Sequence, residues 1–295
     1  MSAIPDPKHA LTASGNLRRR QLVSRAFETA TVLAAALAVA VLLILIYYVV
    51  KHGVSAISLS FFTSDLPAYD GVGGGIGPAL VGTIEMALIA TIIALPTGVL
   101  TALYLSQFAG PRGDRILRLM LDLMAGLPTI IVGVFVAGLI TNHVGPSGLA
   151  GGLALSIVEV PLIARASLEA ISRVPQILVE ASDALGMARW RGIVGVVLPT
   201  ASNGIVTATI LAVARASGET APLLFASELY GQSFSVDARH SLASVPLEIF
   251  TLLESGYPQS ISKAWGAALT LMTVILAANI GARVWLRRSE RKRGL

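Results

Sequence analysis

TATVLAAALAVAVLLILIYYVV, residues 29–50, is a run of 22 uncharged residues between Glu28 and Lys51. At about 1.5 Å per residue, an α-helix of this length crosses the roughly 30 Å of hydrocarbon in a bilayer. A cleavable signal peptide is the alternative, but the run is longer than the core of about 7–15 residues in such a peptide. No clean A-x-A site follows it, so the stretch predicts an uncleaved first membrane span.

The composition of the whole chain agrees with this prediction. Of its 295 residues, 54% are hydrophobic and 13% are charged, and soluble domains are about 25% charged. Several apolar runs far exceed the roughly 9–11 residues of a barrel strand, which predicts an all-α integral membrane protein. Cysteine is absent and the four histidines are scattered, so we expect no disulfide, no thiol chemistry and no metal site.

Five further apolar stretches predict spans at roughly 79–105, 121–141, 148–164, 203–228 and 264–286, which makes six in total. The weakest is 148–164, because it is short and glycine-rich and carries Glu159 and Pro161 near its end. Several glycines in these stretches, such as Gly138, Gly151 and Gly152, predict close approach between helices, because small residues let backbones meet in lipid.

The distribution of Lys and Arg predicts the orientation. With the N-terminus inside, seventeen of these residues fall in inner segments and three, Lys51, Arg239 and Lys263, in outer loops. Both termini are therefore expected in the cytoplasm. This divides the chain into a basic N-terminal segment (1–28), a six-span domain (29–286) and a basic tail (287–295). The net charge of +5 is spread between apolar segments, so nucleic acid is not an expected partner.

The longest predicted cytoplasmic loop, about 165–199, is RASLEAISRVPQILVEASDALGMARWRGIVGVVLP. It is amphipathic on both sides of Gly186, with a break at Pro175. One interpretation is a surface helix on lipid headgroups, which Arg189, Trp190 and Arg191 would suit. The favoured interpretation is a docking element for a cytoplasmic partner, because glycine permits a sharp bend between two short helices.

A charged pair lies within the predicted fifth span, in ILAVARASGETAPLLF (210–225). An arginine at the bilayer centre costs roughly 2.5–3.5 kcal/mol on insertion scales. Arg215 and Glu219 are four residues apart and share a helix face, and Pro222 is expected to bend the span. A pair that only locks helices is one interpretation. We favour a cation facing a polar path for an anion, because buried ion pairs contribute little net stability.

The other embedded acids carry less information. Glu85 and Glu159 are weaker candidates for the substrate path, and Asp122, near the inner boundary, is expected to be solvated or to pair with a partner subunit. The glycine-rich segment 71–78 lacks the Lys-Ser/Thr of a phosphate-binding loop, and the chain contains no Gly-Lys dipeptide. Any nucleotide site must therefore lie on another chain.

Within the 165–199 loop, the spacing resembles the EAA-x3-G-x9-I-x-LP coupling motif of ABC importer permeases. The matching residues are Glu180, Ala181, Gly186, Leu198 and Pro199. Ser182 replaces the third position and Val196 replaces isoleucine. The resemblance implies that this loop docks into an ATPase subunit, with Glu180 and Gly186 at the joint that transmits ATPase closure to the spans.

Over nearly its full length the chain resembles the PstA-type permeases of phosphate-specific (Pst) ABC importers, within the binding-protein-dependent inner-membrane transport family. The matching stretches are GGIGPALVGT (74–83), MAGLPTIIVG (124–133), PLIAR (161–165), the EAA loop and ARASGETAPLLF (214–225). The resemblance implies a type I permease fold that imports inorganic phosphate by alternating access. It places Arg215, Glu219 and Arg165 on the phosphate path.

The resemblance also implies the rest of the assembly. It consists of a homologous PstC-type permease, two cytoplasmic PstB-type ATPases that hold ATP and Mg, and an extracytoplasmic PstS-type phosphate-binding protein, all at a bacterial cell membrane. This chain would bind no cofactor and catalyse no reaction. The alternatives are a permease for another oxyanion (sulfate, molybdate or phosphonate) and, with less support, a proton-coupled secondary carrier that uses Glu219 as a relay.

Overall fold

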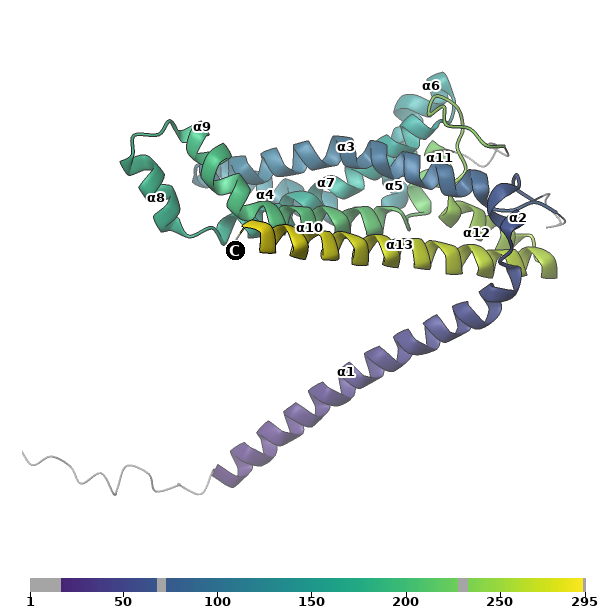
Figure 1. Ribbon diagram of the computed structural model, residues 1–295, viewed down its shortest axis with the longest axis horizontal. Helices are drawn as coiled ribbons and strands as arrows, with labels where there is room; N and C mark the ends of the chain where they lie inside the picture. Colours follow the sequence, from purple (N-terminus) through teal and green to yellow (C-terminus); the bar gives the residue numbers. More distant parts are fainter. Residues whose placement is uncertain (1–16, 68–72, 228–232, 294–295) are drawn as a thin grey trace, which may run out of the picture. The chain divides into compact units, whose positions relative to one another are not determined.

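The computed structural model describes residues 17–67, 73–227 and 233–293, and all regular structure in these ranges is helical (Figure 1). Parts of the predicted basic segments, residues 1–16 and 294–295, lie outside the described ranges. The chain divides into two compact units, Met1–Lys51 and His52–Leu295, and each is described by itself.

Helix α1 (Leu17–Gly53) provides nearly all of the described first unit and contains the first predicted span. The candidate span Arg19–Ala56 has a mean hydropathy of 2.8. The helix has 37 residues and is longer than a bilayer is thick, so its arginine-bearing first turns extend beyond the apolar part. The prediction of a helical first span is confirmed.

Four long helices of the second unit are also candidate spans. They are α3 (Gly77–Gln107), α7 (Gly148–Ser172), the segment Arg189–Ala216 that ends in α10 (Leu198–Ala216), and α13 (Pro258–Arg293) as far as Leu286. Figure 1 shows them running alongside one another, with α8 (Gln176–Ala184) and α9 (Arg189–Gly192) at one end. At the other end lie the short helices η2 (Val54–Ala56), α2 (Leu59–Thr63) and α12 (Val245–Glu254).

Small residues bring α3 and α7 close together. A Cβ on Gly151 would lie 2.5 Å from the Met86 sulfur, and one on Gly152 would lie 2.5 Å from Ile89 Cγ2. Both glycines are buried, so a larger side chain would force the two helices apart. Gly138, which the sequence placed in the same class, has open space around it. The prediction therefore holds for the α3–α7 contact and is wrong for Gly138.

The third predicted span, 121–141, is not one helix. Helix α4 (Pro111–Gly126) ends before Leu127, and α5 (Thr129–Val136) begins after Pro128; η3 (Ala137–Thr141) and α6 (Asn142–Val144) continue from α5. The two halves are bent by 94°. Pro128 lacks an N–H and drives Leu127 into an extended conformation, which ends α4. Counting this bent pair as one span, the described residues contain six candidate spans.

The fourth predicted span, 148–164, is longer than expected. Helix α7 continues through Pro161 and Arg165 to Ser172, which gives it 25 residues. It packs against α3 and α10, and this burial compensates for the hydrogen bond that Pro161 cannot make. The cytoplasmic loop predicted at about 165–199 therefore begins only at Arg173, and Arg165 lies inside a helix.

The fifth predicted span, 203–228, is broken before Pro222 rather than bent at it. Helix α10 follows α9 and η4 (Ile193–Val197) and ends at Ala216, and α11 (Ala221–Ala226) begins five residues later. In between, the Gly218 and Glu219 N–H groups donate to carbonyls only three residues back, at 3.0 Å each. The Pro222 ring would clash with the carbonyl of residue 218 in a continuous helix, so the chain turns there.

Candidate functional site

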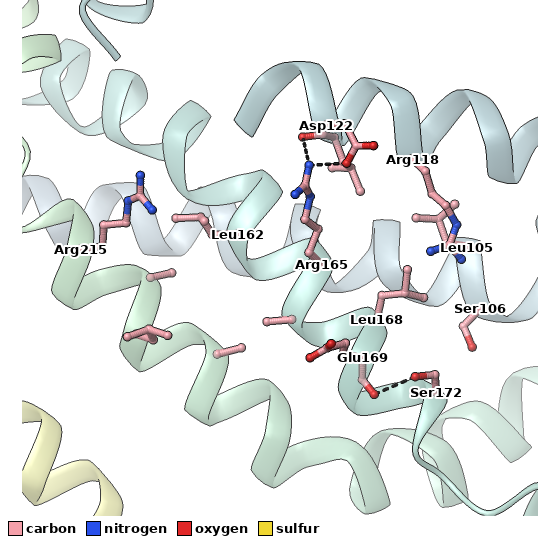
Figure 2. A pocket seen from close by; sticks show the side chains of 15 residues that line it. Leu105, Ser106, Arg118, Asp122, Leu162, Arg165, Leu168, Glu169, Ser172 and Arg215 are labelled. Atoms are coloured by element: carbon pink, nitrogen blue, oxygen red, sulfur yellow. Dashed lines mark hydrogen bonds and ion pairs between the residues drawn. The ribbon is translucent and has the colours of Figure 1, made fainter. Parts of the chain in front are cut away.

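A cleft of about 980 Å³ lies between α3, α4, α7 and α10 (Figure 2). Most of its wall is apolar, formed by residues such as Leu105, Leu162 and Leu211. Its charged lining residues are three arginines and two acids: Arg118, Arg165, Arg215, Asp122 and Glu169. The cleft therefore has a positive balance and can attract an anion.

Arg165 connects α7 to α4 across this cleft. Its guanidinium donates to Asp122 Oδ1 and, at 3.1 Å, to the Leu121 carbonyl oxygen. Figure 2 shows the Arg165 side chain extending from α7 to Asp122, while Arg215 projects from α10 further along the cleft. Sequence reasoning placed Arg165 at the end of a span and expected Asp122 to be solvated or paired with a partner subunit. In the structure the two side chains pair with each other.

Arg215 and Glu219 form the pair that their spacing predicts. Arg215 Nε lies 3.7 Å from Glu219 Oε1, and the Arg215 side chain is 59% exposed whereas that of Glu219 is 18% exposed. The pair spans the end of α10 rather than the middle of a continuous helix, because the helix ends at Ala216. Arg215 lines the cleft, and Glu219 is not among the lining residues. The exposed Arg215 guanidinium is thus accessible from the cleft, whereas the paired Glu219 carboxylate lies outside the cleft lining.

Charged residues on α4 and α7 recur every four residues, a pattern that is visible in the sequence but did not contribute to the predicted site. Asp114, Arg118 and Asp122 lie on one face of α4. Along α7 the order is the reverse, with Arg165 and Glu169 followed by Arg173 at the C-cap. Arg118 donates to Asp114 at 2.8 Å, and Arg173 lies 3.9 Å from Glu169. This spacing was the available signal for Arg118, Asp122 and Glu169.

The two weaker candidates for the path, Glu85 and Glu159, do not line the cleft. Glu159 is fully buried and accepts a 3.5 Å hydrogen bond from Thr91 Oγ1 across the α3–α7 contact. Glu85 is partly buried on α3, and its Oε2 has no hydrogen-bond partner among the described residues. Glu159 thus lies within the α3–α7 contact, and neither acid shares the cleft with the arginines.

The predicted coupling residues form a joint between α8 and α9. Helix α8 ends in a turn in which the Gly186 N–H donates to Asp183 O at 2.9 Å and the Met187 N–H donates to Ser182 O at 3.2 Å. This is a Schellman C-cap, and Gly186 adopts φ +69°, a conformation that residues with a Cβ rarely adopt. The predicted bend at Gly186 is present, and the backbone conformation requires the glycine.

Ser182, which replaces alanine in the resembled motif, is the buried contact of this joint. Its hydroxyl donates to Val179 O at 2.7 Å. A Cβ on Gly192 of α9 would lie 3.0 Å from the Ser182 hydroxyl oxygen. Serine is therefore accommodated because it is small and its hydroxyl is satisfied within α8. Leu198 and Pro199, at the other end of the motif, begin α10.

The opposite surface of α8 is exposed and apolar. Ile177 and Leu185 are 72% and 81% exposed, and Glu180 and Ala181 are exposed on the same short helix. Large apolar side chains left in solvent on a short amphipathic helix indicate a contact surface for another protein. The geometry of α8 thus suits a helix that inserts into a groove.

Arg189 connects the joint to the membrane helices. Its guanidinium donates to the Gln107 carbonyl oxygen at the end of α3 and lies 4.8 Å from the centre of the Phe108 ring. The less favoured interpretation of the loop placed Arg189 on lipid headgroups, whereas in the structure it bonds to the polypeptide. Its neighbour Arg191 lies over the adjacent Trp190 ring, at 5.3 Å.

Comparison with known proteins gives one family. Residues 94–292 match the model of the family described as "Binding-protein-dependent transport system inner membrane component". The chain is 39% identical over 212 residues to "Phosphate transport system permease protein PstA 1" of Mycobacterium tuberculosis, covering 71% of this chain and 69% of that protein. It is 33% identical over 283 residues to "Phosphate transport system permease protein PstA" of Xylella fastidiosa, covering 95% and 98%.

Among solved structures, the fold is similar to a chain of a bacterial alginate ABC transporter in complex with an alginate pentasaccharide-bound periplasmic protein. The TM-score is 0.61 over 92% of this chain and 96% of that chain, at 15% sequence identity. A likeness at this identity bears on the fold alone, and it agrees with the ABC importer type I permease fold that the sequence predicts.

Proposed function

This chain belongs to the family of binding-protein-dependent transport system inner membrane components, as a PstA-type permease, and from this premise we propose how it moves phosphate. The observation that carries the proposal is that Arg165 and Arg215, fifty residues apart in the sequence, line one cleft with Arg118. Guanidinium groups match the geometry of phosphate oxygens, and the exposed arginines here are accessible to an anion in the cleft.

The arrangement of charges also favours brief rather than tight binding of phosphate in the cleft. Arg165 and Arg215 each have a carboxylate within ion-pair distance, Asp122 and Glu219. Phosphate that reaches either arginine competes with that carboxylate, so it is held for a short time and released. A permease needs this balance, because a site that binds its substrate too tightly slows transport.

The cleft extends to Ser106 and Ser172, near the end of the bundle where α8 and α9 lie. We place this end in the cytoplasm, as the Lys and Arg distribution predicts, with both termini on the same side. The cleft is then the inward-facing part of the path. Phosphate passes from Arg215 toward Arg165 and leaves past the coupling joint.

Energy for the cycle would come from partner chains. The exposed apolar surface of α8, with Glu180 and Ala181, is suited to a groove on a cytoplasmic PstB-type ATPase, where ATP and Mg would be held. A PstC-type permease would complete the path in the lipid bilayer, and a PstS-type binding protein would deliver phosphate at the outer face. ATPase closure would reach the spans through the Gly186 joint and Arg189. This chain itself would bind no cofactor.

Labelled-phosphate uptake tests the proposal, with sulfate and molybdate as competitors. The comparison uses cells with the wild-type chain, a deletion and Arg215→Gln, in a host without another phosphate importer. We expect uptake that phosphate alone competes for, lost in the deletion and strongly reduced in Arg215→Gln. Competition by sulfate or molybdate at equal concentration would indicate a permease for another oxyanion. Uptake that persists in the deletion would refute phosphate transport by this chain.

A further inference from the structure

Arg165–Asp122 differs from the other ion pairs formed by the arginines that line the cleft, because it joins two different helices. Arg118–Asp114, Arg173–Glu169 and Arg215–Glu219 each link residues four apart in the sequence. Arg165 and Asp122 are 43 residues apart and connect α7 to α4. Breaking this pair therefore removes a contact between two helices that form the cleft.

The pair is also exposed and can exchange partners. The Arg165 and Asp122 side chains are 46% and 65% exposed, and both line the cleft. An ion pair in such a setting contributes little stability, so another anion can replace the carboxylate at small cost. Phosphate is suited to do so, because arginine binds carboxylate and phosphate with the same two-pronged hydrogen-bonding geometry.

We propose that Asp122 is a release residue, which competes directly with the transported anion for Arg165. This rests on the proposed function, in which phosphate is that anion. When phosphate occupies Arg165, Asp122 is displaced and α4 loses its ionic contact to α7. When Asp122 pairs with Arg165 again, phosphate is expelled from the inner end of the cleft. The same exchange thus couples substrate release to a contact between helices.

Arg215 does not offer the same control. Its carboxylate, Glu219, comes from the same segment of chain and does not line the cleft. Displacing Glu219 leaves the contacts between α4, α7 and α10 unchanged. At Arg165, therefore, the binding of phosphate in the cleft changes a contact between the helices that form its walls, α4 and α7.

The test measures phosphate binding to the purified permease–ATPase complex without nucleotide or binding protein, by equilibrium dialysis with labelled inorganic phosphate. Removing the competitor in Asp122→Asn should tighten phosphate binding about two- to fivefold, the range expected for an exposed ion pair. Phosphate uptake by the complete system should slow by a similar factor, since release is hindered. A purely structural role would lower the number of binding sites or weaken their affinity.

Asp65→Asn is the matched control. Asp65 is an exposed aspartate that does not line the cleft and pairs with none of its arginines, so this variant makes the same change of charge outside the site. We expect its phosphate affinity to remain that of the wild type. In the double variant Asp122→Asn/Arg165→Gln the gain in affinity should disappear, because Asp122 is proposed to act only through Arg165.

Two results would overturn the inference. One is unchanged or weaker phosphate binding in Asp122→Asn, and the other is an equal gain in Asp65→Asn, which would reflect overall charge. These results can be distinguished from failure of the proposed function. If phosphate is not the substrate, the wild-type complex would bind and transport another oxyanion in preference to phosphate. In that event the same variants, measured with the preferred oxyanion, still test competition at Arg165.

Discussion

The arginine-lined cleft and the α8–α9 joint adjoin one another, but they are held together by different kinds of interaction. In the cleft, exposed side chains form ion pairs, and the partners come from α4, α7 and the end of α10. In the joint, backbone hydrogen bonds and one buried serine fix the angle between two short helices, and Gly186 takes a left-handed conformation.

The difference corresponds to two tasks. Exposed ion pairs are worth about 0.2–1 kcal/mol, so they can exchange with a passing anion. A left-handed conformation costs a residue with a Cβ about 1–2 kcal/mol, so the joint tolerates few substitutions and keeps its shape, as the proposed coupling to an ATPase requires. Substitutions in the cleft should therefore alter substrate handling, and those in the joint should alter coupling to ATP.

The largest expected effect separates these two tasks. Arg215→Gln should reduce phosphate uptake about 10- to 100-fold, the range expected for losing a hydrogen bond to a charged group. ATPase subunits should still co-purify in wild-type amounts, because the joint is unchanged. Uptake by membrane vesicles and the composition of the purified complex provide the measurements.

Arg283→Gln is the control for Arg215, since Arg283 lies on α13 and does not line the cleft. It should transport phosphate at close to the wild-type rate. Equal losses in the two variants would show that any arginine in a span is needed for assembly. Loss of ATPase subunits from the Arg215→Gln complex would also contradict the separation of cleft and joint.

A smaller effect is expected in the joint. Gly186→Ala should lower the fraction of correctly bent loops about 5- to 30-fold, corresponding to the cost of a Cβ at positive φ. The phosphate moved per ATP hydrolysed in proteoliposomes should fall, while phosphate binding to the complex stays unchanged. Gly195→Ala is the matched control, because a Cβ there meets open space and the residue has no positive φ. Similar behaviour of both variants would remove the special role of Gly186.

Sequence patterns predicted the parts of this molecule that depend on local chemistry. Apolar length indicated the helical spans, and the motif around Gly186 indicated the bend that the backbone now shows. The effects of two prolines were not predicted: Pro161, near the end of the predicted span 148–164, lies within a continuous helix, whereas Pro128, inside the predicted span 121–141, ends one. The effect of a proline depends on neighbouring helices that can compensate for it, and these are not visible in a local window.

The site was predicted in part for the same reason. Arg215 was identified as a candidate path residue from its charge within a predicted span, and Arg165 from the resemblance. Their common cleft appears only when α7 and α10 pack together. The four-residue spacing on α4 and α7 could have indicated the charged faces. It could not have shown that Asp122 pairs with Arg165 while Asp114 pairs with Arg118, since that choice depends on how the two helices meet.

The smallest predicted effect concerns the connection between the two regions. Arg189 bonds to the Gln107 carbonyl at the end of α3 and lies over Phe108, so it can carry movement of the joint into the helices around the cleft. Arg189→Ala should lower phosphate moved per ATP about two- to fivefold, in line with an exposed cation–π contact of about 0.5–1 kcal/mol. Arg191→Ala should have little effect, because the contact of Arg191 among the described residues is with the ring of its own neighbour Trp190. If both variants reduce coupling equally, their shared role is to hold the loop at the lipid headgroups, and the connection from joint to cleft must run through α10 instead.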